Sequence, residues 1–186
     1  MEHFADKADA FLRRAERQYP APFEIDRDQT VCGLTFPMVA HYEKRDDRYL
    51  MGIVSSISTE GYCGEKCYFL CAEKLDSDTW TDYLARFRRI QDEQVPADDP
   101  FHDFTLISVV VCTAGVDRKV QRQIRRANDY RQYREKDGRH GWSALRLCVA
   151  DLENGAYYCN GMGKSVKECL TRDGLPQKKT PFWRAK

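Results

Sequence analysis

The segment that most constrains the fold is "FTLISVVVC", residues 104–112, the most apolar run in the chain. Its apolar residues occupy odd and even positions alike, whereas a strand with one face in water alternates apolar and polar residues. The run therefore predicts a central strand that is covered on both faces. Such a strand needs a packed layer on each side, and the rest of the chain must supply these layers.

Hydrophobic periodicity along the chain predicts both helices and further strands. Apolar residues recur at spacings of three and four over 3–19, 78–92 and 117–128, which is typical of amphipathic helices, and a last short helix is expected at 165–170. Alternation with period two, or a continuous apolar run, predicts strands at 31–42, 49–57, 66–75, 104–112, 142–152 and 156–160.

The segments between these elements read as turns. "EKRDD" at 43–47 and "STEGYCGE" at 58–65 are expected to be turns, and Asn154-Gly155 is a strong hairpin signal. The predicted order is α-β-β-β-α-β-α-β-β-α. It indicates an α+β fold, a single domain over residues 1–186, with a mainly antiparallel sheet, helices packed on it and a basic, poorly ordered tail from about 174 to 186.

Composition predicts a soluble globular protein and indicates the cellular compartment in which it resides. The chain has 186 residues, of which 42% are apolar and 32% charged, and no run approaches the roughly 20 apolar residues of a membrane helix. Its start lacks an apolar signal core. Eight cysteines in a chain with its own core are expected to be reduced thiols, so we expect a cytoplasmic location.

Three of these cysteines, Cys63, Cys67 and Cys71, stand at a strict four-residue interval that resembles a metal-ligand set. A strand rises about 3.3 Å per residue, so neighbours in this series would lie about 13 Å apart, which is too far to share one ion. We therefore predict one buried face of a strand, with no metal site and no cofactor.

A second motif, "NGMGKS" at 160–165, lies between a predicted strand and a predicted helix. The phosphate-loop pattern needs Gly where this chain has Tyr158, so a Gly-rich turn with Ser165 as N-cap is the preferred interpretation. An anion site made by backbone donors and Lys164 stays open as an alternative.

Basic residues gather in the second half of the chain. Residues 117–186 hold 17 Lys and Arg against 8 Asp and Glu, and the stretch 118–139 interleaves cations with tyrosines. Such a surface is suited to binding nucleic acid. The same composition is equally compatible with a solvent-exposed helix face whose cations attract the acidic residues of the first half of the chain. The nucleic-acid hypothesis uses Arg118, Lys119, Arg122, Arg125 and Arg126.

The helix–strand–strand–strand–helix–strand order is also the core order of restriction-endonuclease-like nucleases. Their chemistry needs an acid on the second strand and an acid-x-Lys on the third, where the carboxylates hold a metal. Glu73 and Lys74 are adjacent and would point to opposite faces, so only a degenerate nuclease is compatible with this order.

Residues 102–170 resemble an uncharacterised prokaryotic domain family of unknown function. The similarity rests on "HDFTLISVVVC", "GVD" before a basic helix, and "GWSALRLCVADLENGAYYCNGMGKSV". This resemblance implies one domain in a prokaryotic cytoplasm, and it implies no activity, cofactor or catalytic residue.

No complete catalytic set is recognisable, so the preferred hypothesis is a non-enzymatic domain that binds a protein partner or a small anionic ligand. A thiol-based enzyme stays possible if one cysteine is exposed. Trp142 and Arg146 share parity on one predicted strand, and a buried arginine needs an anionic partner. The candidate ligand site comprises Tyr130, Tyr133, His140, Trp142, Arg146, Asn160 and Lys164.

Overall fold

The computed structural model describes residues 3–49 and 58–172, with side chains for 3–44 and 61–172. The described helices are α1 (Phe4–Glu16), α2 (Ser77–Gln94), α3 (Arg118–Arg126), α4 (Lys164–Thr171) and the short 3-10 helix η1 (Glu135–Asp137). The described strands are β1 (Glu24–Val31), β2 (Leu34–Tyr49), β3 (Ser58–Cys71), β4 (His102–Thr113), β5 (Tyr130–Gln132), β6 (Trp142–Asp151) and β7 (Ala156–Cys159).

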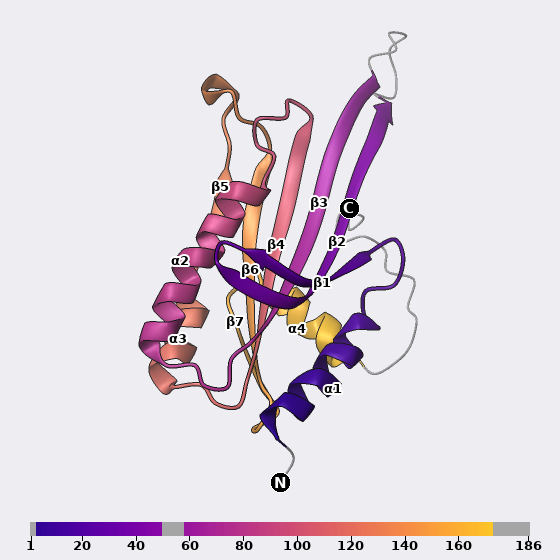
Figure 1. The fold of residues 1–186 in the computed structure, drawn as a ribbon. Coiled ribbons are helices and arrows are strands. Elements are labelled where there is room, and N and C mark those ends of the chain that lie inside the picture. Colours follow the sequence, from indigo (N-terminus) through magenta and orange to yellow (C-terminus); the bar gives the residue numbers. More distant parts are fainter. Residues whose placement is uncertain (1–2, 50–57, 173–186) are drawn as a thin grey trace.

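All seven strands belong to one mixed sheet of order β1-β2-β3-β4-β6-β5, and β7 also pairs with β6 (Figure 1). The central pairings β3–β4 and β4–β6 are parallel, and the outer ones are antiparallel. Strand β5 pairs with the start of β6 and β7 with its end, so both lie along the same edge. The parallel centre follows from the helical crossovers α2 and α3, since parallel neighbours need long connections.

Helices cover both faces of the sheet (Figure 1). On one side α2 and α3 close a core of large aliphatic and aromatic side chains, which we call the α2/α3 face. On the other side α1 and α4 close a second core, the α1/α4 face, to which the sheet contributes smaller side chains. Strand β4 lies in the centre and is buried on both faces, as its apolar run predicts.

The α+β fold and the order of its main elements are confirmed. Two strands are added outside the predicted ones: β1, over 24–31, and the short β5, within a stretch that reads as polar and irregular. The turn at Gly155, which has a φ of +61°, joins β6 and β7 as the Asn-Gly signal predicts. In the described residues, no helix is long and apolar enough to cross a membrane.

Two predicted turns are wrong. Residues 43–47 continue β2, and the hairpin with β1 closes earlier, at Cys32 and Gly33, which both have a positive φ. Residues 58–65 belong to β3 because they pair with β2 on one side, and from Tyr62 onward with β4 on the other. Most of the strand expected at 49–57, and the basic tail expected at 174–186, lie outside the described residues.

Helix boundaries also differ slightly from the sequence pattern. The N-cap of α2 is Asp76, whose carboxylate accepts hydrogen bonds from the backbone N–H groups of Asp78 and Thr79 at 3.2 and 2.9 Å. The pattern favours Asp78 or Thr79 for this role. Asp76 takes it because a cap must precede the first helical turn, where unpaired N–H groups point back along the axis.

Candidate functional site

Helix α3 presents a strongly basic outer face. Val120 and Ile124, which are four residues apart, point inward and are fully buried. All five cations of the helix are exposed, and in the described part of the chain none of them takes part in a hydrogen bond or ion pair. These are the residues named for nucleic-acid binding: Arg118, Lys119, Arg122, Arg125 and Arg126.

The charge arrangement of α3 works against the helix itself. Like charges three and four residues apart repel, and Arg122 has such a neighbour in each of these positions. Arg118 and Lys119 lie in the first turn, at the positive end of the helix dipole, where acids are favoured, whereas the arginines of the last turn are placed favourably. Asp117, the N-cap, makes no side-chain cap hydrogen bond. The surface therefore carries an uncompensated positive charge.

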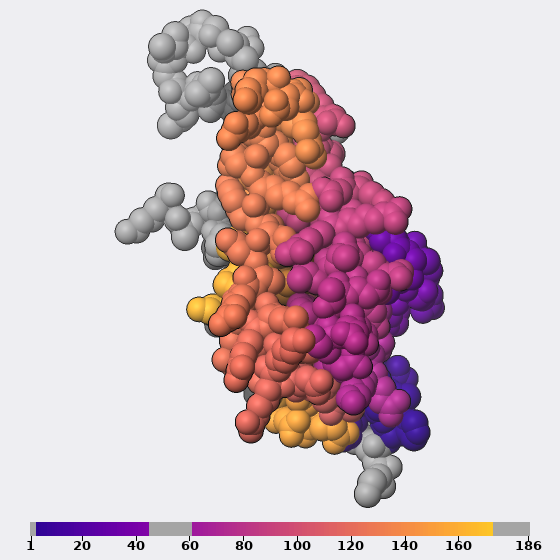
Figure 2. All heavy atoms as spheres, turned by 90° about the vertical axis from the view of Figure 1, so that its left-hand side faces the viewer, coloured from indigo at the N-terminus to yellow at the C-terminus, as the bar shows by residue number. Residues whose placement is uncertain are grey.

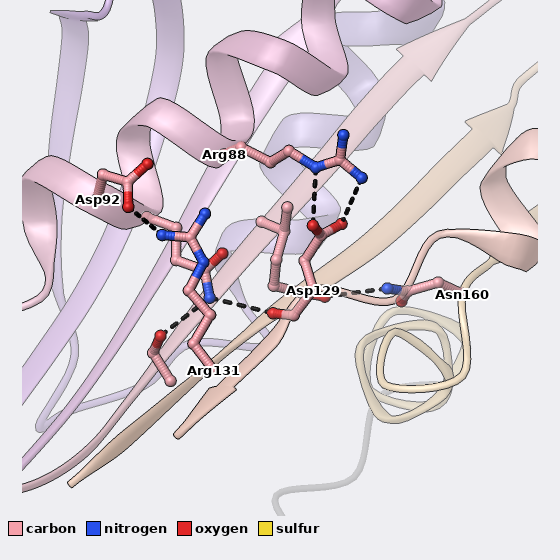
Figure 3. A network of polar contacts seen from close by, with 8 residues as sticks. Arg88, Asp92, Asp129, Arg131 and Asn160 are labelled. Carbon is pink, nitrogen blue, oxygen red and sulfur yellow. Dashed lines mark hydrogen bonds and ion pairs between the residues drawn. The ribbon is translucent and has the colours of Figure 1, made fainter. Parts of the chain in front are cut away.

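Two arginines outside α3, Arg88 and Arg131, behave differently, as Figure 3 shows. The guanidinium of Arg88 on α2 holds both carboxylate oxygens of Asp129 at 2.7 and 3.3 Å, and Arg131 pairs with Asp92. These two pairs tie α2 to the segment that contains β5. The arginines of α2 and β5 therefore pair with acids of the fold, as the alternative interpretation of the charge asymmetry expects, whereas those of α3 do not.

Two of the residues proposed for ligand binding meet in an aromatic group at the start of β6. The ring of Trp142 stacks on Phe104 with centroids 5.1 Å apart and an interplanar angle of 20°, and it lies 5.7 Å from the ring of Tyr130. Tyr130 is 49% exposed. Strand register brings these side chains to the α1/α4 face, on the same face as Arg146.

Arg146 is buried, and its anionic partner belongs to the chain itself. Its guanidinium forms an ion pair with Glu65 on β3, and its Nε donates to the hydroxyl of Ser108 on β4 at 2.7 Å. Burial disfavours its charge, but Glu65 more than offsets this effect, so the pKa of Arg146 is raised. Its charge is thus balanced without an external ligand.

Tyr133 and His140 lie in a different, buried polar cluster on the other side of the sheet. The hydroxyl of Tyr133 is 2.8 Å from that of Ser143, and the backbone carbonyl of His140 is 2.6 Å from Nδ1 of His102. A carbonyl only accepts, so Nδ1 of His102 carries the hydrogen and Nε2 faces the Thr105 hydroxyl at 2.9 Å. Burial lowers the pKa of His102, which keeps the ring neutral.

The "NGMGK" turn has a structural explanation. The side-chain oxygen of Asn160 accepts from the backbone N–H groups of Leu147 and Gly163, and its amide donates to the carbonyl of Leu145 (Figure 3 shows the last bond). A Cβ at Gly163 would collide with the carbonyl of Leu147. Gly163, and not Ser165, is therefore the N-cap of α4, and Lys164 is exposed in its first turn.

A cavity of about 540 Å³ lies where the parallel strands β3, β4 and β6 end. Ligands of open sheets with parallel strands bind at this edge. Its lining includes Glu73, Lys74, Asp117 and Asp151, and Asp151 is already engaged by the backbone and side chain of Asn154. The sequence did not point to this cavity, because its position depends on parallel pairing that local patterns do not show.

Among the described residues, no three His, Cys, Asp or Glu side chains gather closely enough to hold a metal ion. Cys63, Cys67 and Cys71 share one face of β3, as predicted, but only Cys67 is buried, and the expectation that Cys71 is buried is wrong because it ends the strand and is half-buried. Glu73 and Lys74, the adjacent pair considered for a nuclease, lie beyond the end of β3 and line the cavity, so they do not form the acid-x-Lys of a nuclease strand.

Comparison with known proteins finds one family. A family model described as "Domain of unknown function (DUF8052)" matches residues 7–172. No curated protein and no solved structure matches the chain.

Proposed function

The chain belongs to this family of unknown function, and we propose that it is a non-enzymatic domain that binds nucleic acid through the exposed face of α3. The observation that carries the proposal is the set of five exposed cations without an ion pair among the described residues. A helix whose cations repel one another, and which places two of them at the positive end of its dipole, breaks local rules, and such violations are typical of functional surfaces. A bound polyanion would supply the missing counter-charge.

The chemistry of α3 favours phosphate over other anions. Four of its five cations are arginines, whose planar guanidinium matches phosphate geometry with two hydrogen bonds. Duplex DNA carries one negative charge per about 1.7 Å of axis, so several cations on one short helix contact phosphates together. Phosphate contacts carry no sequence information, so we propose binding that is independent of sequence.

Figure 2 shows that α3 is accessible to a large ligand. The helix lies on the surface beside α2, and no described segment passes over it in this view. The two helices also contact each other beneath this surface. Because the arginines of α2 are engaged in ion pairs, the cations without an ion-pair partner on this pair of helices belong to α3.

A second candidate function is the binding of a small ligand by the aromatic group of Tyr130, Trp142 and Phe104. Its support is the stacked geometry of the rings and the exposure of Tyr130. Of the seven residues proposed from the sequence, these contacts bring together only Tyr130 and Trp142. A nucleobase or another flat ring fits such a surface, so the two functions are compatible.

The experiment that tests the main proposal measures the fluorescence anisotropy of a labelled duplex of about 20 base pairs, and of one of its strands, at about 50 mM salt. Binding should weaken roughly tenfold in the double variant Arg118→Gln/Arg122→Gln. The matched control is Arg13→Gln/Arg17→Gln, which removes an exposed arginine pair of the same spacing from the last turn and C-cap of α1. Equal affinities of the two variants, or no binding by the wild type, would contradict the proposal.

The setting we propose is the cytoplasm of a prokaryotic cell. All eight cysteines are free thiols, which suits a reducing compartment.

A further inference from the structure

Cysteines are concentrated on one side of the sheet. Six of the eight lie in or beside the core between the sheet and helices α1 and α4. They come from three neighbouring strands, from β7 and from α4: Cys67, Cys71, Cys112, Cys148, Cys159 and Cys169. The mechanism proposed for α3 uses none of these thiols.

Two of them, Cys148 on β6 and Cys159 on β7, face each other directly across an antiparallel pair. The backbone N–H of Asn160 donates to the carbonyl of Leu147, so this neighbouring pair is the hydrogen-bonded one. The 148–159 pair is therefore the non-hydrogen-bonded kind, in which Cα atoms are only about 4.5 Å apart and side chains are closest. That separation lies within the range that disulfides span.

The sulfur atoms are already close. The two Sγ atoms are 3.4 Å apart, and a disulfide bond measures about 2.05 Å, so each sulfur would move by about 0.7 Å to close it. We propose that Cys148 and Cys159 form an oxidation site at which a hydroperoxide converts the two thiols into an intramolecular disulfide.

The two thiols are suited to different steps. Cys159 is half-buried, whereas Cys148 has no exposed surface. The hydrogen bond between the two thiols lowers the pKa of Cys159, and the nearby Lys167 acts in the same direction. The same contact, together with burial, raises the pKa of Cys148. Cys159 is therefore the thiolate that meets the oxidant.

The reaction balances with hydroperoxide as the only oxidant. The Cys159 thiolate attacks one peroxide oxygen; an S–O bond forms, the O–O bond breaks, and the departing oxygen takes a proton and leaves as an alcohol or as water. The sulfur of Cys148 then attacks the resulting sulfenic acid. An S–S bond forms, the S–O bond breaks, and the hydroxyl leaves as water with the proton of Cys148. Two thiols lose two electrons, and the peroxide gains them.

Cys71 and Cys112 provide an internal comparison. They are also in register, but on the parallel strands β3 and β4. Parallel ladders have evenly spaced hydrogen bonds and lack the close non-hydrogen-bonded positions of antiparallel pairs. The disulfide is therefore expected at Cys148–Cys159 and not at this second pair.

Trypsin makes the test direct, because cleavage after Arg146 and Lys164 releases a peptide whose only cysteines are Cys148 and Cys159. Folded protein is treated with increasing hydrogen peroxide, alkylated, digested and examined by mass spectrometry. The peptide should become lighter by two hydrogens, escape alkylation, and regain both thiols after dithiothreitol treatment.

Two variants complete the experiment. Cys159→Ser, at a partly exposed position, should abolish the change in this peptide, and Cys71→Ser should leave it intact. The proposal is overturned if both thiols remain alkylatable while other cysteines oxidise, or if Cys159 goes directly to a sulfinic acid that dithiothreitol does not reverse.

Discussion

The two faces of one sheet are built from different materials. The α2/α3 face is packed with Leu, Ile, Val and large aromatic residues, including the fully buried Trp80 and Phe87. To the α1/α4 face the central strands contribute cysteines, Ala150 and a buried arginine, and Phe69 and Val110 are their larger apolar residues there. Adjacent residues of β6, such as Leu147 and Cys148, therefore lie in different chemical environments.

This difference indicates a division of labour. Burial free energy scales with apolar area, so the larger side chains make the α2/α3 face the main source of stability. The small, polarisable thiols of the α1/α4 face contribute less burial free energy than large apolar side chains would. They also leave room for the Arg146–Glu65 ion pair and for the Cys148–Cys159 pair. On the outer side of α3, repulsion between neighbouring cations lowers the stability of the helix.

The largest expected effect compares neighbouring residues on opposite faces. Leu147→Ala should lower the free energy of unfolding by about 3.5 kcal/mol, because it removes a fully buried side chain and leaves a cavity. Cys148→Ala should cost only about 1 kcal/mol, since it removes a single sulfur atom. Urea denaturation measures both values. Equal costs would break the comparison between the faces.

Arg146 tests the polar part of the α1/α4 face. Arg146→Met should cost about 2.5 kcal/mol, because Glu65 loses its partner while the methionine chain keeps most of the packing. This cost is lower than for a fully buried ion pair because the Glu65 side chain is 21% exposed, so water partly solvates its charge. Glu65→Leu/Arg146→Met should recover much of the loss in the same urea assay. A double variant no more stable than the single one would contradict this account.

His102 tests the polar cluster beneath α2. Burial lowers its pKa in the folded state below the ordinary value of about 6.5, so the unfolded chain binds the proton more tightly. The free energy of unfolding should therefore fall as pH drops below about 6.5. His102→Gln should flatten this dependence, whereas His3→Gln, at an exposed position, should not. Thermal denaturation between neutral and mildly acidic pH would show whether the two variants differ.

The smallest effect concerns the repulsion within α3. Arg122→Gln removes like-charge contacts with four neighbouring cations of the helix and should stabilise the protein by about 0.5 kcal/mol at low salt. The gain should disappear at high salt, where exposed charges are screened. A loss of stability at low salt would mean that Arg122 contributes to the fold after all.

Much of the fold could be predicted from the sequence, because strong periodicity marks elements that are buried on one or two faces. The central strand β4, the helices and the Asn154–Gly155 turn are examples. The predicted turns at 43–47 and 58–65 were wrong. Their polar and Gly-rich residues belong to long strands, which are stabilised by pairing with strands distant in the sequence. Local patterns do not report such pairing.

The candidate site was predictable only in part. The basic residues of α3 are evident in the sequence. Their lack of ion pairs is not, because it depends on nearby acids, Asp129 and Asp92, pairing with Arg88 and Arg131 instead. Asn160 looked like a ligand residue because a backbone-capping amide and a binding amide are identical in sequence. The Cys148–Cys159 contact depends on strand register, which spacing alone does not define.

The most direct test of the central claim is the salt dependence of duplex binding. Each phosphate contact contributes about −0.9 to the slope of log K against log[salt]. Removal of Arg118 and Arg122 should therefore make the slope less steep by about 1.8, while Arg13→Gln/Arg17→Gln leaves it unchanged. A slope that both variants share with the wild type would show that α3 does not contact the phosphates.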